Sequence, residues 1–192
     1  VVEFGRQAAF PVVVKAIEGA RIRRAGGFPV AIVRDASELL AAYRQMEDPE
    51  APNLMLQEYI PGGEDSVWMF NGYFNARSEC LFGVTGHKIR QTPPYKGMTS
   101  LGICRANALV DELTREFMKA IGYRGILDIG YRFDARDGRY KALDANPRVG
   151  ATFRLFVSAE RLDVIRALYL DLTGQPVPAT RAVEGRKWFV ED

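Results

Sequence analysis

Three polar side chains stand at the end of a predicted strand near residue 145, in the run Asp144-Ala-Asn-Pro-Arg148. Side chains alternate between the two faces of a strand, so Asp144, Asn146 and Arg148 are expected on the same face. A carboxylate beside an amide oxygen suits Mg²⁺ that bridges phosphates, and an arginine can clamp a phosphoryl or carboxylate group with two hydrogen bonds. A plain strand end that runs into an Asn-Pro turn is the alternative interpretation.

A second carboxylate is expected on the neighbouring strand. Asp128, Gly130 and Arg132 share one face of that strand, and a predicted hairpin leads from it back to Asp144. Two carboxylates on adjacent strands repel each other unless a cation lies between them. The pattern therefore indicates either a pair that binds a cation or a surface carboxylate paired with Arg132 or Arg148.

Two further strands carry cations. Lys88 and Arg90 alternate with Ile89, which predicts that both cations share a face. Such a pair suits a polyphosphate, and it equally suits a solvated edge that resists aggregation. Lys15 ends an apolar strand, and because a lysine is rarely fully buried alone, a phosphate is one candidate partner for it. An ordinary surface lysine is the alternative.

The segment Gln57-Glu-Tyr-Ile-Pro-Gly-Gly-Glu64 is predicted as a strand that ends in a Pro-Gly turn. Backbone N–H and C=O groups at the edge of such a strand can pair with the rim of an adenine ring. Just past the turn, the Glu64 carboxylate would accept hydrogen bonds from ribose hydroxyls. A glutamate in an ordinary turn is the competing interpretation.

Hydrophobic periodicity predicts the elements that must position these groups. The first third of the chain should form strands 10–15, 28–33 and 54–60 and a helix that begins after a cap at Asp35. The rest should form strands 66–70, 73–74, 79–85, 125–133 and 139–143, a helix after Asn107 with Val110, Leu113, Phe117 and Ile121 at helical spacing, and a last helix 153–172. Asn71-Gly72 is predicted as a hairpin turn. This order predicts an α+β fold with mostly antiparallel sheets, divided near Pro61 into units 1–60 and 61–192.

Composition excludes several classes of protein. The 192 residues carry 26 basic and 24 acidic side chains, so there is no general reason to expect nucleic acid or an acidic membrane as a partner. Two cysteines and one histidine rule out a disulfide framework and the common zinc patterns. The longest apolar run, roughly seven residues, is too short to cross a bilayer. Without a signal-peptide pattern, the cytoplasm is the expected location.

Taken in chain order, these motifs resemble the ATP-grasp superfamily. The order is a strand lysine, a glycine turn, a strand suited to adenine, a glutamate, a basic strand, a carboxylate strand and Asp-x-Asn-Pro-Arg. Within that superfamily, the chain looks most like the proteins described as carboxylate–amine ligase-like. Three runs carry this similarity: 56–63, Lys88-Ile-Arg-Gln91 with Pro93-Pro94, and 134–141.

The resemblance implies two α+β lobes that grip ATP between them, with 1–60 as the smaller lobe and 61–192 as the larger lobe. Lys15 matches the lysine that contacts the α-phosphate and adenine, and Gln57 matches the position near the adenine amino group. Glu58 and Ile60 match the hinge whose backbone pairs with adenine, and Glu64 matches the ribose-binding glutamate.

The resemblance also implies a metal site. Asp144 and Asn146 match the metal-binding Glu-x-Asn motif, with aspartate in place of glutamate. The family commonly has another metal-binding carboxylate at the position of Gly130, and Asp128, two residues earlier on the same face, is the expected substitute. Four cations are implied to offset charge during phosphoryl transfer: Lys15, Lys88, Arg90 and Arg148.

The activity implied is that of an ATP-dependent ligase that joins a carboxylate to an amine or a thiol. The carboxylate attacks the γ-phosphate of ATP to give an acyl phosphate, from which the amine displaces phosphate. The implied cofactors are ATP and Mg²⁺, with Mn²⁺ as a substitute, and the implied partners are small-molecule carboxylates and amines. The chain is expected to be the ATP-binding part, truncated before an N-terminal domain that helps to form the acceptor site; a homodimer stays open.

Two other functions stay open on the sequence. Gly130 and the short Asp144 side chain are compatible with a module that binds nucleotide without catalysis. A protein-interaction domain is the second alternative, in which an aromatic group would form the contact surface unless it builds the core: Trp68, Phe70, Tyr73 and Phe74.

Overall fold

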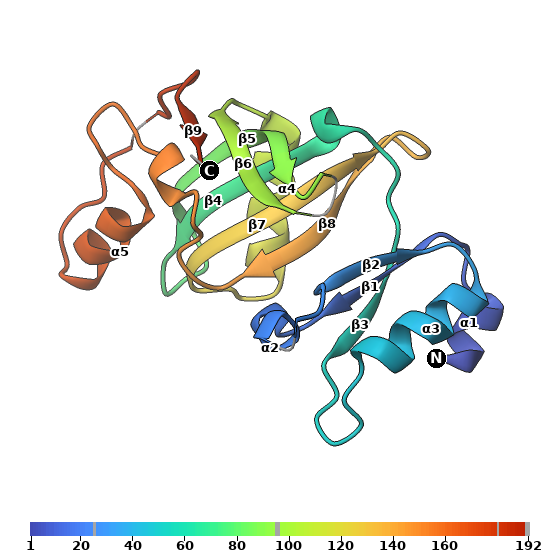
Figure 1. Cartoon of the computed structure of the whole chain (residues 1–192). Helices are drawn as coiled ribbons and strands as arrows, with labels where there is room; N and C mark the ends of the chain where they lie inside the picture. Colours follow the sequence, from blue (N-terminus) through green and yellow to red (C-terminus); the bar gives the residue numbers. More distant parts are fainter. Residues whose placement is uncertain (25, 95–96, 180, 191–192) are drawn as a thin grey trace. The chain divides into compact units, whose positions relative to one another are not determined.

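The structure is a computed structural model that describes residues 1–24, 26–94, 97–179 and 181–190, and only the backbone at Glu64. The chain separates into two compact units, Val1–Ile60 and Pro61–Asp192, each with its own antiparallel sheet (Figure 1). Helices and antiparallel strands occur together in both units, so the predicted α+β class is confirmed. In the described part of the chain, no helix is long and apolar enough to cross a membrane.

The first unit is a three-stranded sheet with β1 in the centre, between β2 and β3. Its elements in chain order are α1 (Val2–Gln7), β1 (Val12–Ala16), α2 (Gly19–Arg24), β2 (Val30–Val33), α3 (Ala36–Met46) and β3 (Leu54–Glu58). Asp35 caps α3 as predicted, because its side chain accepts hydrogen bonds from the backbone N–H groups of Ser37 and Glu38 at 2.8 and 2.9 Å. Val14 and Leu39 are fully buried in the core that joins this helix to the sheet.

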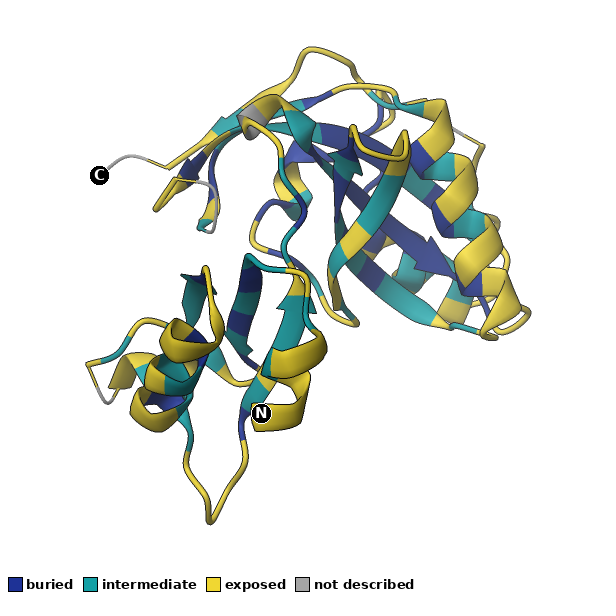
Figure 2. Cartoon of the chain, turned by 90° about the vertical axis from the view of Figure 1, so that its right-hand side faces the viewer, coloured by how far each residue is buried: buried dark blue, intermediate teal, exposed yellow. Residues whose placement is uncertain are grey.

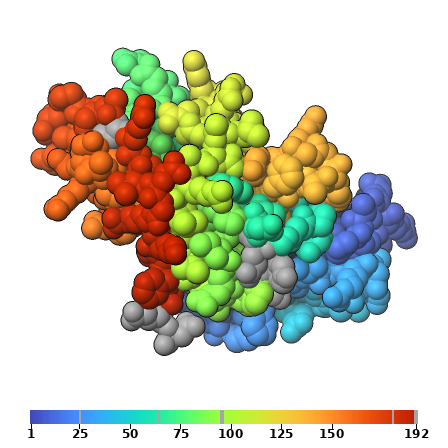
Figure 3. Space-filling model, turned by 90° about the horizontal axis from the view of Figure 1, so that it is seen from above, coloured from blue at the N-terminus to red at the C-terminus, as the bar shows by residue number. Residues whose placement is uncertain are grey.

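The second unit is built on a six-stranded sheet in the order β8-β7-β4-β5-β6-β9. Its elements in chain order are the 3₁₀ turn η1 (Glu64–Ser66), β4 (Val67–Phe74), β5 (Cys80–Thr92), β6 (Met98–Cys104), α4 (Ala108–Ala120), β7 (Gly125–Asp134), β8 (Arg139–Asn146), the 3₁₀ turn η2 (Phe153–Leu155), α5 (Val164–Leu172) and β9 (Lys187–Phe189). Viewed from above in Figure 3, the C-terminal strand β9 (red) lies beside β6 (yellow-green), with which it pairs.

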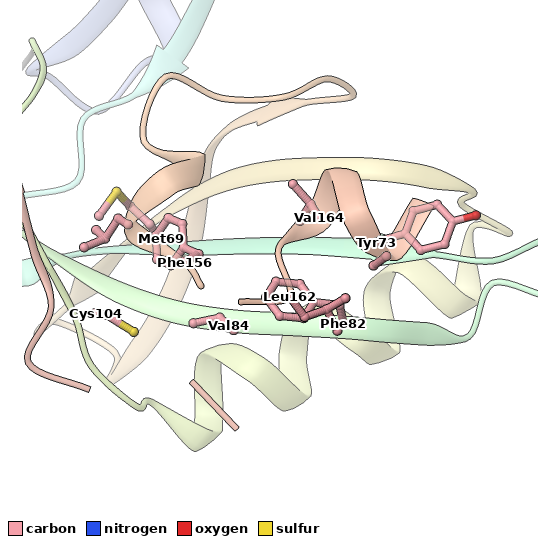
Figure 4. Close-up of a cluster of buried hydrophobic side chains, with 10 residues drawn as sticks. Met69, Tyr73, Phe82, Val84, Cys104, Phe156, Leu162 and Val164 are labelled. Atoms are coloured by element: carbon pink, nitrogen blue, oxygen red, sulfur yellow. The ribbon is translucent and has the colours of Figure 1, made fainter. Parts of the chain in front are cut away.

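Alternation along β4 sends its aromatic side chains into two buried clusters. On one face, Met69 and Tyr73 pack with Val164 of α5 (Figure 4). On the other face, Phe70 and Phe74 pack with α4. These rings are at most 3% exposed, so they build the core of the unit rather than an aromatic contact surface.

The hairpin predicted at Asn71-Gly72 is wrong, because β4 continues through both residues and pairs there with β5 and with β7. The chain turns only after Phe74, where β4 ends. Asn75 closes that turn, since its side-chain oxygen accepts hydrogen bonds from the backbone N–H groups of Arg77 and Glu79, both at 2.9 Å. Asn71-Gly72 is a sequence typical of a turn, but pairing with β5 on one side and β7 on the other keeps it extended.

The single helix predicted over 153–172 is also wrong. The chain forms the short turn η2, passes through a loop and starts α5 only at Val164. Asp163 sets this start, because its carboxylate accepts hydrogen bonds from the backbone N–H groups of Ile165 and Arg166, both at 3.0 Å.

Candidate functional site

Strands β7 and β8 bring the predicted acidic residues together on one face of the larger sheet. Asp128 lies directly opposite Asn146, and Gly130 lies directly opposite Asp144. Ile129 packs into the cluster under α4, so Asp128 and Gly130 point to the other face of the strand. The predicted arrangement of two carboxylates on neighbouring strands is therefore present in the structure.

The three polar groups at the end of β8 are linked by hydrogen bonds. Asn146 Nδ2 donates to Asp144 Oδ2 at 3.2 Å, and Arg148 Nη2 donates to Asn146 Oδ1 at 3.1 Å. Arg148 Nη1 also donates to the backbone oxygen of Val149 at 3.2 Å. Asp144 and Arg148 are exposed and Asn146 is partly buried, so oxygen and guanidinium groups line a surface that a ligand can reach.

Asp128 is the carboxylate of this face whose pKa is shifted by its surroundings. Burial raises its pKa above the ordinary value, and the negative charge of Asp144 adds a smaller increase. The positive charges of Lys88 and Arg148 lower the same pKa, as does the side chain of Asn71. Lys88 and Arg148 therefore lie close enough to Asp128 to act on it, and the charged form of this carboxyl gains from any further cation placed nearby.

Two glycines shape the space around Asp128. A Cβ at Gly150 would lie within 3.0 Å of the Asp128 carboxylate, so the backbone of the loop after β8 passes against that group. At Gly130 a Cβ would meet nothing within 4 Å, so the position opposite Asp144 is open. The sheet thus leaves room for a ligand on the side of Asp144.

The prediction that Lys88 and Arg90 share a face is wrong. Lys88 pairs with Gly102 but Arg90 pairs with Leu101, so the register shifts by one residue between them and Ile89 is extra. Since neighbouring residues of β6 point to opposite faces, the bulge separates the two cations. Arg90 Nε donates to Ser100 Oγ at 3.1 Å, while Lys88 is the cation that acts on the acidic site.

In the first unit, Lys15 and Gln57 lie on the sheet face that the helices leave open. Lys15 alternates with the buried Val14 and pairs with Met55, and Gln57 pairs with Val13. The face is therefore apolar with a cation and an amide set into it. A flat apolar ring with polar groups at its rim, such as adenine, suits a surface of this kind.

The remaining predicted nucleotide contacts follow Gln57. Glu58 is exposed and ends β3, and Ile60 is 5% exposed at the end of the unit. The Glu64 side chain lies outside the described part of the structure, so the contact between Glu64 and ribose stays a prediction.

Sequence reasoning missed Asn71 and Gly150. Asn71 is 0% exposed and lies directly opposite Asp128 on β4, where its side chain lowers the pKa of that carboxyl. This role was not predicted, because the pair Asn71-Gly72 is typical of a turn. The available signal was a polar residue at an inward-facing position of a strand whose side chains alternate. Gly150 carried no local signal, because its importance comes from a contact with another strand.

The donor set fits a magnesium ion. Among the residues that the structure describes, no three histidine, cysteine, aspartate or glutamate side chains cluster as a complete metal cage. Mg²⁺ seldom uses such a cage, because it keeps several waters and binds one or two carboxylates together with substrate phosphates. The oxygens of Asp144 and Asn146, with Asp128 on the next strand, match that mode of binding.

The chain has the ATP-grasp fold. Three solved structures are similar to this chain. The biotin carboxylase–β,γ-ATP complex from Campylobacter jejuni superposes with a TM-score of 0.68 and 16% identity over 93% of this chain and 40% of that one. An ADP complex of N5-carboxyaminoimidazole ribonucleotide synthetase gives a TM-score of 0.68 and 13% identity over 94% of this chain and 46% of that one. The biotin carboxylase domain of the Hydrogenobacter thermophilus 2-oxoglutarate carboxylase, bound to MgADP, gives a TM-score of 0.65 and 15% identity over 94% of this chain and 40% of that one.

A curated relative adds similarity in sequence. The chain is 24% identical over 115 residues to a D-aspartate ligase of Enterococcus faecium (strain Aus0004), which is 59% of this chain and 27% of the relative. The chain thus spans about a quarter of that relative and less than half of each solved structure. No family model matches the sequence. The predicted resemblance to the ATP-grasp superfamily is confirmed at the level of the fold.

Proposed function

We propose that this chain is the ATP-binding part of an ATP-dependent ligase that joins a carboxylate to an amine or a thiol through an acyl phosphate. The observation that carries the proposal is the pairing of Asp128 with Asn146, beside Asp144 and Arg148, on one face of an ATP-grasp sheet. Similarity to a D-aspartate ligase and to structures that hold ADP or MgADP supports it.

The unit Val1–Ile60 is proposed as the smaller lobe, which binds the nucleoside. Its open sheet face carries Lys15 for adenine and the α-phosphate, and Gln57 for the adenine amino group. The backbone of Glu58 and Ile60 would pair with the edge of the ring, and Glu64 would bind the ribose.

The unit Pro61–Asp192 is proposed as the larger lobe, which binds the phosphates and Mg²⁺ or Mn²⁺. Asp144 and Asn146 would hold the cation, with Asp128 as a further carboxylate. When bound, the cation neutralises and bridges phosphate oxygens. Lys88 and Arg148 would offset the charge that develops during transfer, and the bulge removes Arg90 from this group.

The reaction needs positioning more than a general base. A substrate carboxylate oxygen forms a bond to the γ-phosphorus while the bond to the leaving oxygen of ADP breaks. The amine nitrogen then bonds to the acyl carbon, inorganic phosphate leaves, and the amine loses a proton to solvent. An N-terminal domain of the same protein is proposed to complete the acceptor site for small-molecule substrates.

A second candidate function is nucleotide binding without catalysis. The open space at Gly130, opposite Asp144, favours it, because the second carboxylate lies two residue pairs away along the strands instead of facing Asp144. Such a module would bind ATP with little dependence on metal and would release no ADP with any carboxylate.

The test is calorimetric titration of ATP into the 192-residue chain, with and without Mg²⁺, on the wild type and on two variants. Asp144→Ala should abolish the Mg²⁺-dependent part of the affinity, whereas Glu50→Ala, an exposed carboxylate in a loop of the first unit, should leave it unchanged. Equal Mg²⁺ dependence in wild type and Asp144→Ala would refute the metal assignment. Binding without Mg²⁺ dependence would favour the module that does not catalyse.

A further inference from the structure

Asn71 is a fully buried amide in the middle of the larger sheet. All residues of β4 except Trp68 are buried, and Asn71 itself is 0% exposed (Figure 2). It points to the same face of the strand as Met69 and Tyr73, which pack into the core beside α5. A leucine at this position would extend that apolar core, so packing alone does not account for the amide.

The two polar atoms of this side chain are not paired. Asn71 Nδ2 and Asn71 Oδ1 have no hydrogen-bond partner among the residues that the structure describes. A buried amide without partners costs stability, and native proteins keep such a group where it has a functional role or where a water or an ion pairs with it. The position of this amide therefore points to the site beside it.

Asp128 is the polar group that faces Asn71. Strand β7 lies between β4 and β8, and Asp128 is directly opposite Asn71 on one side and Asn146 on the other. Residues directly opposite each other in an antiparallel pair have Cβ atoms about 4.5–5.5 Å apart. This separation lets the amide of Asn71 reach the Asp128 carboxylate.

The other neighbours of this row leave Asp128 as the partner for Asn71. Asn146 is engaged elsewhere, because its Nδ2 donates to Asp144 and its Oδ1 accepts from Arg148. On β5, Asn71 faces the apolar Val84. Burial raises the pKa of Asp128, and Asn71 opposes that rise, as a hydrogen-bond donor to a carboxylate does.

The loop after β8 limits how the Asp128 carboxylate can turn. A Cβ at Gly150 would lie 2.1 Å from Asp128 Oδ2, so the backbone of the loop closes one side of this group. A donor on β4 then fixes the rotation that remains. A metal site needs this constancy, because ligating carboxylates are held in orientation by hydrogen bonds from residues behind them.

We propose that Asn71 is a positioning residue of the candidate cation site, whose amide donates to one oxygen of Asp128 and directs the other oxygen towards Asp144. The inference rests on the proposed function, because the cation is the one that Asp144, Asn146 and Asp128 would hold. Asn71 acts through Asp128 and touches neither the cation nor ATP. Loss of such a partner typically lowers metal affinity by about 10- to 100-fold.

Asn71→Leu removes the amide and nearly keeps its volume. Mg²⁺-dependent ATP affinity, measured by calorimetric titration, should fall about tenfold or more. The midpoint of thermal unfolding without ATP or Mg²⁺ should stay the same or rise, because an unpaired buried amide has been removed.

Thr114→Val is the matched control, since it removes a buried polar group on the other face of the sheet. Thr114 is 0% exposed on α4, and its hydroxyl donates to the backbone oxygen of Val110 at 2.6 Å. Thr114→Val should lower the unfolding midpoint and leave the Mg²⁺ dependence of ATP binding unchanged. The two variants thus separate an effect on the site from an effect on stability.

An exchange of the two side chains tests the contact without any ligand. Asn71→Asp alone should lower the unfolding midpoint, because two carboxylates would then face each other inside the sheet. Asn71→Asp combined with Asp128→Asn should restore much of the midpoint, since one amide again faces one carboxylate. The double variant should still lack the Mg²⁺-dependent ATP affinity, because its carboxylate lies on β4, one strand further from Asp144.

An Asn71→Leu variant with the Mg²⁺ dependence of the wild type would overturn the proposal, and so would a double variant no more stable than Asn71→Asp. A loss of affinity in Asn71→Leu that comes with a loss of stability like that of Thr114→Val would show a structural role instead. A wild type without Mg²⁺-dependent binding would refute the proposed function and the metal role of Asn71 with it. In that case the exchange in the unliganded protein still decides whether Asn71 and Asp128 are in contact.

Discussion

The backbone of Gly150 passes directly against the carboxylate of Asp128, at a distance that leaves no room for a Cβ. Asp128 belongs to β7, whereas Gly150 follows β8, so the loop after Asp-x-Asn-Pro-Arg folds back over the acidic face. This contact holds in place the one carboxylate of the site that burial pushes towards its neutral form. The loop that contains Gly150 and strand β7 are therefore expected to act together in the proposed binding of ATP and metal.

The contact predicts opposite outcomes for two glycine-to-alanine substitutions. Gly150→Ala should move Asp128 or the loop, which we expect to lower Mg²⁺-dependent ATP affinity at least tenfold and to destabilise the fold by about 1–3 kcal/mol. Gly130→Ala should have little effect on stability, because its Cβ enters open space. Calorimetric titration and thermal unfolding of both variants make the comparison. Equal losses in the two variants would contradict the assigned contact.

The bulge in β5 predicts that Lys88 and Arg90 are not equivalent. Lys88→Met should weaken ATP binding, because it removes the cation that acts on the acidic face, whereas Arg90→Met should have a much smaller effect. Titration of ATP and Mg²⁺ into each variant measures the difference. A larger loss for Arg90→Met would mean that the two cations are assigned the wrong way round.

Asp134 predicts how the larger unit responds to acid. The hydrogen bond from Arg136, followed by that from Lys141, holds the pKa of the Asp134 carboxyl well below its ordinary value. Because the folded pKa is depressed, this group stabilises the fold above the unfolded pKa of about 3.9, and the contribution is lost as pH falls towards the folded pKa. Asp134→Asn should therefore lower the midpoint of thermal unfolding at neutral pH, and the gap to the wild type should narrow below roughly pH 4. Asp137→Asn on the same hairpin is the control, with a smaller expected shift.

A buried tyrosine joins β4 to α5. The Tyr73 hydroxyl donates a hydrogen bond to Asp171 Oδ2 at 2.6 Å, and Tyr73 is 3% exposed. Tyr73→Phe should cost about 1–2 kcal/mol of unfolding free energy at neutral pH, measured by urea denaturation. Tyr169→Phe, whose ring is 60% exposed, should cost much less.

The same hydroxyl predicts a response to alkali. Burial, followed by the hydrogen bond to Asp171 and the negative charge of Asp171, raises the pKa of Tyr73 to about 12. Since the folded pKa lies above the unfolded value of about 10, the stabilisation is complete below pH 10 and disappears as pH rises through the folded pKa. Unfolding midpoints of wild type and Tyr73→Phe should therefore converge between about pH 10 and pH 12. A constant difference across that range would show that the hydroxyl does not titrate with folding.

Local sequence pattern was enough to predict which chemical groups meet on the acidic face. Alternation places Asp144, Asn146 and Arg148 on one side of a strand, and the turn residues between β7 and β8 bring Asp128 onto the neighbouring strand. The rule holds because the side-chain period of a strand is a local property of the backbone, independent of what the strand pairs with. The fold class followed in the same way, from the order of periodic segments.

Contacts between distant parts of the chain determine where simple alternation fails to predict the position of a side chain. A bulge set by pairing with β6 separates Lys88 from Arg90, and pairing on both sides keeps Asn71 inside a strand. Which side of α4 is buried likewise depends on the sheet beneath it, since two apolar rows on one helix compete for the same core. Gly150 matters only because a distant strand brings a carboxylate to its backbone. These features come from contacts between residues far apart in the chain, and hydrophobic periodicity carries no information about such contacts.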